Sequence, residues 1–300
     1  MTVLSGPLVS VLIPTFNRSR LLMLAIESVL SQHYENLEII VVDNNSTDDT
    51  EKLVGLFNGH NIIYVKNKIN IGAVHNYNRA LQMATGKYIH FFSDDDIMLQ
   101  PDCISFKVAV FERYECVGLV HSDIQIIDDF GEVTYGHWAS NNKEWLAVNS
   151  SPLMGKKQAH ALLYDNWIFI SMPSVMVRKS ILDEYRIEFN NQLKFLVDWD
   201  MWLKISLFGD FYFINQKLIS YRNHSKNESK DLNMDKDVHF LELMIAKLGL
   251  VNLYSQNTNQ SEVKMLEIVR STKSQLKWLQ EDNKILRPVK NAIKKILKSN

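Results

Sequence analysis

Cysteine is almost absent from this chain of 300 residues, which contains only Cys103 and Cys116. Two cysteines cannot build the disulfide framework of a small secreted domain, and these two lack metal-type spacing. We therefore expect buried, reduced thiols in a reducing compartment. An excess of charge of one sign is also absent, because 33 Lys and Arg against 34 Asp and Glu give a net charge of −1. This balance excludes a protein that binds nucleic acid through bulk positive charge.

Long hydrophobic runs and a leader sequence are missing too. The longest apolar stretch, Trp167 to Val177, is too short to span a bilayer and contains Pro173. The opening residues, MTVLSGPLVSVLIP, have no positive n-region and no small-residue cleavage site, so we expect no signal peptide. These absences predict a cytoplasmic protein without a membrane span. Hydrophobic residues at 46% and charged residues at 22% are otherwise typical of globular proteins.

Glycine-rich phosphate fingerprints do not occur. No GxGxxG follows a predicted strand, and GxxxxGK[ST] is absent from the chain. A dinucleotide-dependent dehydrogenase and a P-loop kinase are therefore excluded. A diphosphate bound by this chain would need a metal ion in place of the glycine-rich loop.

Hydrophobic periodicity alternates between two patterns over the first 92 residues. Short β-branched runs that end at proline, glycine or polar clusters predict buried strands, and apolar residues at helical spacing predict helices. The predicted strands span 9–14, 37–42, 62–65 and 88–92, and the predicted helices span 19–31, 48–57 and 73–84. This alternation indicates an α/β fold with a Rossmann-like, mostly parallel sheet and helices on both faces.

The pattern changes in the rest of the chain. Strands at 117–122 and 174–178 and a helix at 198–208 are predicted within a less regular region. Further helical patterns follow at 237–254, 262–279 and 288–297. We therefore expect a helical C-terminal extension after the α/β part.

Polar clusters follow three of the predicted strands at their carboxyl ends. These clusters are Thr15 to Arg18, Asp43 with Asn44, and Ser93 to Asp96. Sheets of this class bind their ligands beyond the carboxyl ends of the strands. The topology therefore predicts that the three clusters meet in one site.

The acidic cluster contains three adjacent carboxylates, Asp94, Asp95 and Asp96. They would repel one another without a compensating cation. A strand-end loop suits oxygen ligation of Mg²⁺ or Mn²⁺, which use one or two carboxylates together with substrate phosphates. The alternative is a solvated acidic turn that caps the next helix. Asp43 and Asn44 suit a nucleotide base or ribose, with a simple Asx turn as the alternative.

The three clusters together resemble those of one known family. VSVLIPTFNR, LEIIVVDNNSTDDT and GKYIHFFSDDDIMLQPD match, in order and spacing, the inverting family 2 glycosyltransferases of the GT-A fold. The resemblance covers roughly residues 8 to 225 and points to the type that assembles bacterial surface polysaccharides. It implies a GT-A domain at 1–225, and a helical extension at 226–300. Within that domain the nucleotide-sugar half ends near residue 102, and the acceptor half follows it.

The resemblance also implies a role for individual residues. Donor contacts are expected from Thr15, Asn17, Arg18, Asp43, Asn44, Asn78, Asp94, Asp95 and Arg222. Asp94 and Asp96 would form the DxD motif that binds Mg²⁺ or Mn²⁺, with Asp96 as the principal ligand. His224, in a segment that resembles the family's Tyr-Arg-x-His, would ligate the metal or contact the diphosphate; the alternative is an ordinary surface histidine. Arg222 would pair with a phosphate.

The segment FLVDWDMWLK resembles the family's acidic motif, whose aspartate acts as the general base. Matched position by position, this residue is Asp198. The reaction needs a carboxylate that takes a proton from the acceptor hydroxyl as it attacks the anomeric carbon. The alternative for Asp198 is a helix N-cap, and Asp200 can cap or orient the first turn.

Two positions depart from the family pattern. Asn44 stands where many members have a second aspartate, so the recognised base is open. Tyr77 stands where an arginine is common, so its diphosphate contact is missing or comes from elsewhere, with the neighbouring Arg79 as a candidate. Both changes concern the donor.

The resemblance implies metal-dependent, inverting transfer of a hexosyl or deoxyhexosyl group from a nucleotide diphospho-sugar to a saccharide acceptor, expected to be lipid-linked. O-antigen or capsule biosynthesis is the implied setting. Two alternatives remain, a nucleotidyltransferase and a non-catalytic protein that binds sugar nucleotides. Five of the six tryptophans are candidates for acceptor contacts or for core packing: Trp138, Trp145, Trp167, Trp199 and Trp202.

The last eighteen residues, 283–300, carry six basic side chains and no acidic one. Apolar residues stand between them, as in a helix that lies on an anionic bilayer. The alternative is a helix packed on the domain or on another subunit. The first interpretation predicts peripheral contact with the inner face of the cell membrane.

Overall fold

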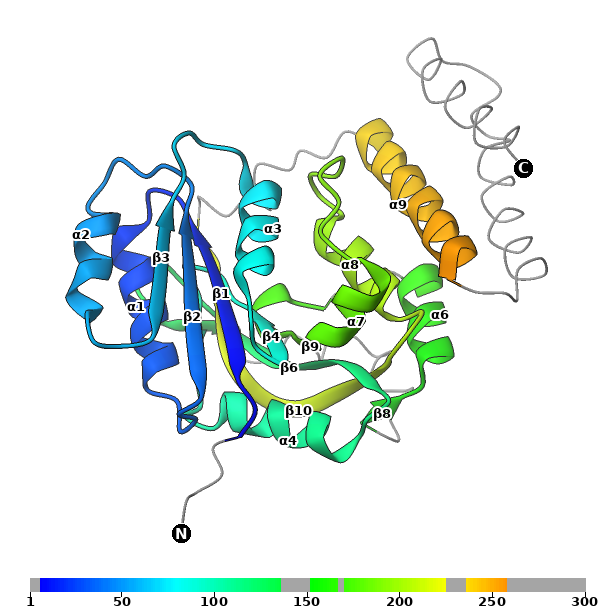
Figure 1. Ribbon diagram of the computed structural model, residues 1–300, viewed down its shortest axis with the longest axis horizontal. Helices are drawn as coiled ribbons and strands as arrows, with labels where there is room; N and C mark the ends of the chain where they lie inside the picture. The colour runs from blue at the N-terminus through cyan, green and yellow to red at the C-terminus, as the bar shows by residue number, and fades with distance from the viewer. Residues whose placement is uncertain (1–5, 136–151, 167–169, 225–235, 258–300) are drawn as a thin grey trace. The chain divides into compact units, whose positions relative to one another are not determined.

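The computed structural model describes residues 6–135, 152–166, 170–224 and 236–257. Within these residues the strands form one ten-stranded sheet in the order β3-β2-β1-β4-β9-β6-β10-β5, with β7 beside β6 and β8 beside β10 (Figure 1). The strands are β1 (Val9–Thr15), β2 (Leu37–Asp43), β3 (Ile62–Lys66), β4 (Tyr88–Phe91), β5 (Ile97–Met98), β6 (Val117–Ile127), β7 (Val133–Tyr135), β8 (Leu153–Met154), β9 (Met176–Arg178) and β10 (Asp210–Arg222).

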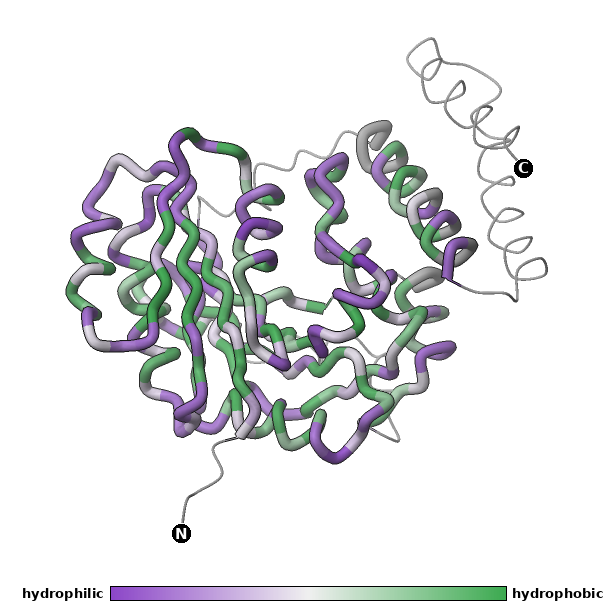
Figure 2. Tube along the Cα trace, in the orientation of Figure 1, coloured by the Kyte–Doolittle hydropathy of each residue, from purple (hydrophilic) through white to green (hydrophobic). Residues whose placement is uncertain are grey.

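The first four strands are parallel, as the alternating pattern predicted. Their registers bring their carboxyl ends level, because Thr15 of β1 pairs with Asp43 of β2, which pairs with Lys66 of β3. The strands are hydrophobic along their length, while the loops at their ends are hydrophilic (Figure 2). The polar clusters therefore lie at one edge of the sheet.

Helices cover both faces of the sheet. The described α-helices are α1 (Ser19–Leu30), α2 (Thr50–Val54), α3 (Ala73–Met83), α4 (Cys103–Arg113), α6 (Lys156–Asn166), α7 (Lys179–Tyr185), α8 (Val197–Ile205) and α9 (Lys236–Asn257). Val11 and Ile13 of β1 join Leu22 of α1 and Phe111 of α4 in one buried cluster. On the other face α3 packs on β1 and β2. This arrangement is the predicted α/β fold.

The face that carries α3 also holds an aromatic core. The ring of Phe91 in β4 lies 5.1 Å from the ring of Phe189 and 5.7 Å from that of Trp202 in α8. Trp202 is buried, as expected for core packing. Trp138, Trp145 and Trp167 lie outside the described residues. This core fixes α8 beside the carboxyl end of β4.

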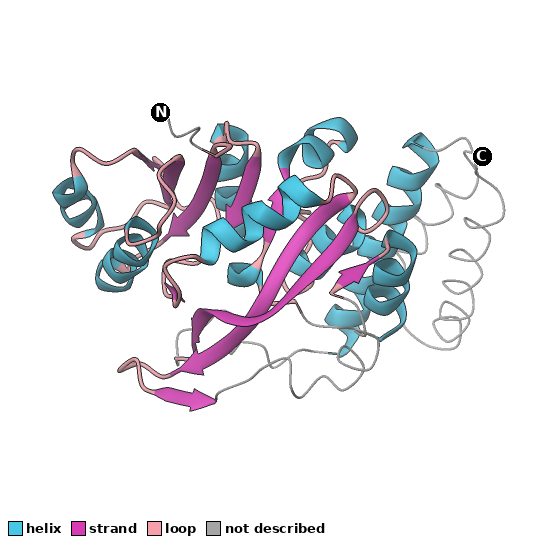
Figure 3. Cartoon of the chain, turned by 90° about the horizontal axis from the view of Figure 1, so that it is seen from below, coloured by secondary structure: helices cyan, strands magenta, loops and turns pink. Residues whose placement is uncertain are grey.

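The second half mixes strand directions. β9 runs antiparallel to both β4 and β6, whereas the two longest strands, β6 and β10, run parallel and side by side (Figure 3). The strand predicted at 174–178 is shorter than expected, because residues Met172–Ser174 form a 3₁₀ turn (η3) that contains Pro173. The expectation of two buried cysteines is wrong for Cys116, which is exposed in the turn before β6.

The chain divides into two compact units after Glu242. The first unit therefore includes the beginning of α9, whereas the sequence predicted an extension from residue 226; that boundary stays a prediction. Of the second unit, the structure describes residues 243–257, the continuation of α9. The helical patterns predicted at 262–279 and 288–297 lie outside the described residues. None of the described helices combines the length and the hydrophobicity needed to cross a bilayer.

Candidate active site

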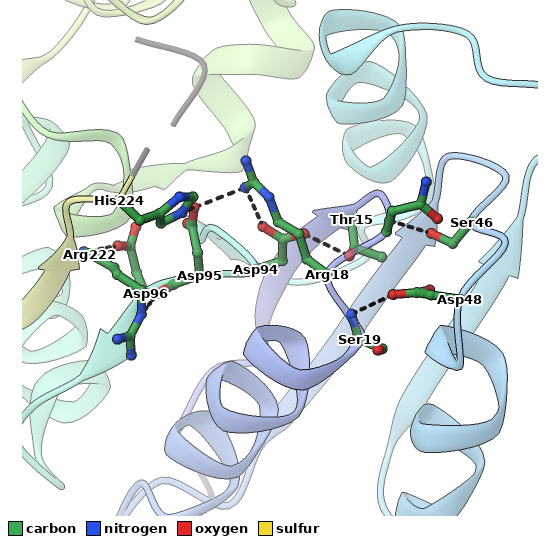
Figure 4. A network of polar contacts seen from close by, with 11 residues as sticks. Thr15, Arg18, Ser19, Ser46, Asp48, Asp94, Asp95, Asp96, Arg222 and His224 are labelled. Atoms are coloured by element: carbon green, nitrogen blue, oxygen red, sulfur yellow. Dashed lines mark hydrogen bonds and ion pairs between the residues drawn. The ribbon is translucent and has the colours of Figure 1, made fainter. Parts of the chain in front are cut away.

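The acidic loop that follows β4 lies against the loop that follows β1 (Figure 4). Thr15 donates its hydroxyl hydrogen to Asp94 Oδ2 over 2.7 Å. The Nη1 of Arg18 lies 3.0 Å from Asp94 Oδ1 and 2.9 Å from Asp95 Oδ2, so one guanidinium joins two carboxylates. The predicted meeting of these two clusters is thus present in the structure.

The end of β10 contacts the same loop from the other side. His224 Nε2 lies 2.9 Å from Asp95 Oδ2. The backbone N–H of Arg222 donates to Asp96 Oδ1 over 2.8 Å. Asp96 Oδ2 is buried and accepts no hydrogen bond from the part of the chain that the structure describes.

Burial shifts the titration of the loop. Burial, followed by the neighbouring charge of Asp95, raises the pKa of Asp94 to about 6, against the lowering effect of Arg18 and Thr15. Burial, followed by the charge of Asp95, raises the pKa of Asp96 well above its usual value. The folded loop therefore disfavours the ionised form of Asp94 and Asp96, and an added cation would favour that form.

A cavity of about 500 Å³ opens at this edge of the sheet. It is lined by six of the predicted site residues: Thr15, Arg18, Asn44, Asp94, Asp95 and Asp198. Residues from other elements complete its wall: Asn70, Tyr77, Ser171, Met172, Pro173, Phe195 and Tyr221 among them. The cavity brings the acidic loop and the predicted general base into one space.

Asp198 lies in the first turn of α8. Its Oδ1 accepts the N–H of Trp199 over 2.7 Å. The N-cap of the helix is Leu196, so the alternative interpretation of Asp198 as the N-cap is wrong. Burial raises the pKa of Asp198 to about 6. Asp200 is not in the cavity wall; it is buried and pairs with Lys204, whose Nζ lies 2.6 Å from its Oδ2.

The side chains of Asn17 and Asp43 accept hydrogen bonds from backbone N–H groups. Asn17 has a φ of 52°, its N–H donates to Ser46 Oγ, and its Oδ1 accepts the N–H of Thr47. Asp43 is buried and accepts from the N–H of Ser46 over 2.7 Å and from the hydroxyl of Tyr64 over 2.6 Å. Asn17 therefore fastens the loop after β1 to the loop after β2, whereas Asp43 fastens the loop after β2 to itself and to β3. Neither residue is in the cavity wall.

Asn44 lines the cavity but uses its amide within the chain. Its Nδ2 donates to Asn70 Oδ1, and its Oδ1 accepts from the N–H of Ile71 and from Asn67 Nδ2. Arg79, the candidate for a diphosphate contact, donates to Asn67 Oδ1. These bonds tie the loop after β3 to the site.

Asn78 and Arg222 also bond to backbone. Asn78 donates to the carbonyl oxygen of Phe189 over 2.8 Å and accepts its N–H over 2.9 Å. Arg222 donates through Nε to the carbonyl oxygen of Asp95 and through Nη1 to that of Asp128. Neither residue is in the cavity wall, and their predicted donor contacts stay predictions.

The turn that contains Pro173 was not predicted as part of the site. The carbonyl oxygen of Pro173 can only accept, so His90 Nε2, 3.0 Å away, donates the hydrogen. Burial lowers the pKa of His90 well below its usual value, which keeps the ring neutral. The one sequence feature that could have indicated this contact is His90 itself, a polar residue within a predicted buried strand.

Similarity to known proteins agrees with this geometry. The sequence profile described as "Glycosyl transferase family 2" matches residues 10–186. The chain belongs to glycosyl transferase family 2. The matched residues include both loops that hold Asp94 and Arg18, while Asp198 lies beyond the match.

Relatives within and around this family extend the similarity. An uncharacterized glycosyltransferase of Rickettsia prowazekii is 31% identical over 223 residues, which are 73% of this chain and 65% of that protein. A chondroitin synthase of Escherichia coli is 29% identical over 262 residues, 85% of this chain and 35% of the synthase. This family 2 chain therefore spans less than two thirds of these relatives.

Solved structures share this fold. The crystal structure of S. aureus TarS 1-349 in complex with UDP-GlcNAc superposes with a TM-score of 0.64 at 18% identity, covering 87% of this chain and 70% of that one. The predicted GT-A-like fold is thereby confirmed.

Proposed function

We propose that this family 2 chain transfers a sugar from a nucleotide diphospho-sugar to a hydroxyl of a saccharide acceptor, with inversion at the anomeric carbon. One observation carries the proposal: Asp94 and Asp95 line the same cavity as Asp198, a separate carboxylate whose pKa is raised to about 6. An acidic loop for a diphosphate–metal group and a base for an acceptor are the two parts that this reaction needs.

The acidic loop fits a divalent metal by its donor set. It offers carboxylate oxygens, Asp96 Oδ2 is buried without a partner in the described residues, and the pKa of Asp94 is raised. No three metal-ligating side chains converge within those residues, so the diphosphate would supply further ligands. Asp94 and Asp96 would hold Mg²⁺ or Mn²⁺ together with the diphosphate, and the metal would neutralise charge on the departing nucleoside diphosphate. His224, whose Nε2 lies 2.9 Å from Asp95 Oδ2, would contact the diphosphate, the second of its two predicted roles.

Donor binding would involve the residues around that loop. Arg18 lies at the cavity wall with a cationic group 3.0 Å from Asp94, where it can also pair with a phosphate oxygen. Thr15 orients Asp94, and Asn44 with Asn70 presents amide groups where a nucleotide base would lie. The complex named for TarS contains UDP-GlcNAc, which supports a nucleotide-sugar donor here.

Asp198 would act as the general base. With a pKa of about 6 its carboxyl is mostly ionised at pH 7, yet it is more basic than an ordinary aspartate. Its bond to the N–H of Trp199 leaves the second oxygen to accept the proton of the acceptor hydroxyl. The name chondroitin synthase supports a saccharide acceptor; a lipid-linked acceptor in surface-polysaccharide assembly follows from the sequence resemblance alone.

A panel of nucleotide sugars tests the proposal. A specific donor should raise the melting temperature in the presence of Mn²⁺ and lose that effect with EDTA. With a saccharide acceptor, that donor should release nucleoside diphosphate. Asp198→Asn should lower turnover about 10²- to 10⁴-fold and leave donor binding within about twofold. Asp183→Asn, an exposed aspartate of α7, is the matched control.

The same assay separates the alternatives. Release of pyrophosphate from a nucleoside triphosphate and a sugar phosphate would identify a nucleotidyltransferase. Donor binding without release of any product would identify a non-catalytic protein. Either result contradicts the proposed transfer.

A further inference from the structure

The carboxylate of Glu242, in α9, is buried against the segment that leads into α8. Its Oε1 accepts the N–H of Lys194 over 2.8 Å. Its Oε2 accepts the N–H of Phe195 over 2.8 Å and that of Leu196 over 3.0 Å. Glu242 is 5% exposed; its bond to Leu196 is buried, and the other two are partly buried. One acid thus binds three consecutive backbone amides from about 46 positions away in the sequence.

These amides lead directly into the helix that carries Asp198: Leu196 is the N-cap of α8, and Lys194 and Phe195 precede it. Leu196 is an apolar residue that makes no side-chain capping bond. The first turn of a helix leaves backbone N–H groups without partners, and its dipole favours a negative charge there. Glu242 accepts the N–H of the N-cap residue Leu196 and places a carboxylate beside the N-terminus of the helix. It does so from another part of the chain.

The segment 194–196, whose amides Glu242 binds, also contributes to the cavity wall. Phe195, whose N–H Glu242 binds, lines the cavity, and Asp198 lines it three residues later. Asp198 in turn binds the N–H of Trp199. Two carboxylates therefore hold the backbone on either side of the point at which the chain enters the helix.

We propose that Glu242 is a positioning residue for Asp198, so that the start of the C-terminal helix is required for the placement of the base. The inference rests on the proposed function, in which Asp198 takes the acceptor proton. Small displacements of a reacting group lower rates strongly, because transfer needs a near-attack geometry. Donor contacts are expected from Thr15, Arg18 and Asp94, which lie on other elements. Loss of Glu242 should therefore reduce turnover and leave donor binding intact.

The test compares Glu242→Ala and Glu242→Gln with Gln256→Ala, a control at an exposed amide of the same helix. Glutamine keeps the length of the side chain and one acceptor oxygen, so it should rescue part of the effect. We expect Glu242→Ala to lower kcat at least about tenfold with the donor KM within about twofold, and Glu242→Gln to lower kcat less than about fivefold. Gln256→Ala should match the wild type.

Hydrogen exchange supplies a readout that does not depend on activity. In Glu242→Ala, exchange in the peptide that covers residues 194–199 should accelerate at least about tenfold, while β1 to β4 keep their protection. Glu242→Gln serves the same comparison if the alanine variant fails to fold. Unchanged protection of 194–199, unchanged kcat, or a rise in the donor KM equal to the fall in kcat each overturns the inference. A wild-type protein that transfers no sugar overturns the proposed function instead, and the exchange data then decide the hold of Glu242 on α8 alone.

Discussion

At the scale of single residues, Asp198 combines a cost in stability with a use in chemistry. Burial raises the pKa of Asp198 to about 6, which means that the folded protein disfavours its ionised form. The same environment gives the carboxylate a basicity suited to proton transfer near neutral pH. Two measurements, the pH dependence of kcat and the free energy of unfolding, should separate the effect of this burial on chemistry from its effect on stability.

The first prediction concerns the pH dependence of turnover. At saturating donor, kcat should fall as the pH drops through about 6, because Asp198 then takes up the proton that disables it as a base. Saturation keeps the titration of Asp94, which has a pKa of about 6 as well, mainly in the donor KM. Initial rates measured between about pH 5 and pH 8 show whether kcat falls on the acid side. A flat kcat across that range contradicts the role of Asp198.

The second prediction concerns stability. An aspartate has a pKa near 4 in an unfolded chain, so the raised value in the folded state makes the protein more stable when Asp198 is protonated. This stability is present below about pH 4 and is lost as the pH rises through about 6, a difference of about 3 kcal/mol. Asp198→Asn should therefore increase the free energy of unfolding at pH 7.5 by about 1–3 kcal/mol.

Urea unfolding at two pH values measures this change. The gain should vanish near pH 4, where the wild-type carboxyl is already protonated. Asp183→Asn, on the exposed surface of α7, should show no such gain at pH 7.5. A variant of Asp198 that is less stable than the wild type at pH 7.5 would contradict the penalty assigned to its burial.

At the scale of elements, loops are held by side chains that the sequence motifs placed at the ligand. Asn17 accepts the N–H of Thr47 in the loop after β2, and Asn78 joins α3 to the backbone of Phe189. A motif shows that a residue belongs to the site region. It does not show whether the side chain points toward the cavity or toward backbone, since both uses need a specific polar group.

Asn78 allows a direct comparison of these two uses. In the structure its amide makes two buried bonds to the backbone of Phe189, so Asn78→Ala should leave an N–H and a carbonyl without partners. The free energy of unfolding should fall by about 2–4 kcal/mol. Gln82→Ala, on the same helix, should change stability by less than about 0.5 kcal/mol.

The contrary outcome is a change in the binding of the nucleotide-sugar donor. If Asn78→Ala kept its stability and raised the donor KM about tenfold, the predicted donor contact would account for the residue. Denaturation and donor titration on one preparation distinguish the two.

At the scale of the whole molecule, the basic segment 283–300 stays a prediction from sequence, because it lies outside the described residues. Its six basic residues should attract an anionic bilayer by about 1 kcal/mol each near the surface. The full chain should sediment with vesicles that contain phosphatidylglycerol and stay in solution with neutral vesicles. Deletion of residues 283–300 should abolish sedimentation.

A charge-reversal variant controls for the shortened chain. Lys294→Glu combined with Lys295→Glu should weaken vesicle binding and leave the length of the chain unchanged. Sedimentation that survives both changes would contradict the membrane interpretation. A change in oligomeric state on deletion would instead support packing against another subunit.

The sequence alone determined the parallel half of the fold and the region of the site, since strand periodicity, turn residues and strand-end polar clusters are local signals. It placed Thr15, Arg18, Asp94 and Asp95 together because parallel strands end at one edge. Tertiary structure alone decided which polar groups face the cavity, how burial shifts the pKa of Asp198, and that Glu242 binds the segment that leads into α8. These properties depend on neighbours brought together by folding from distant positions, and no local pattern of residues encodes them.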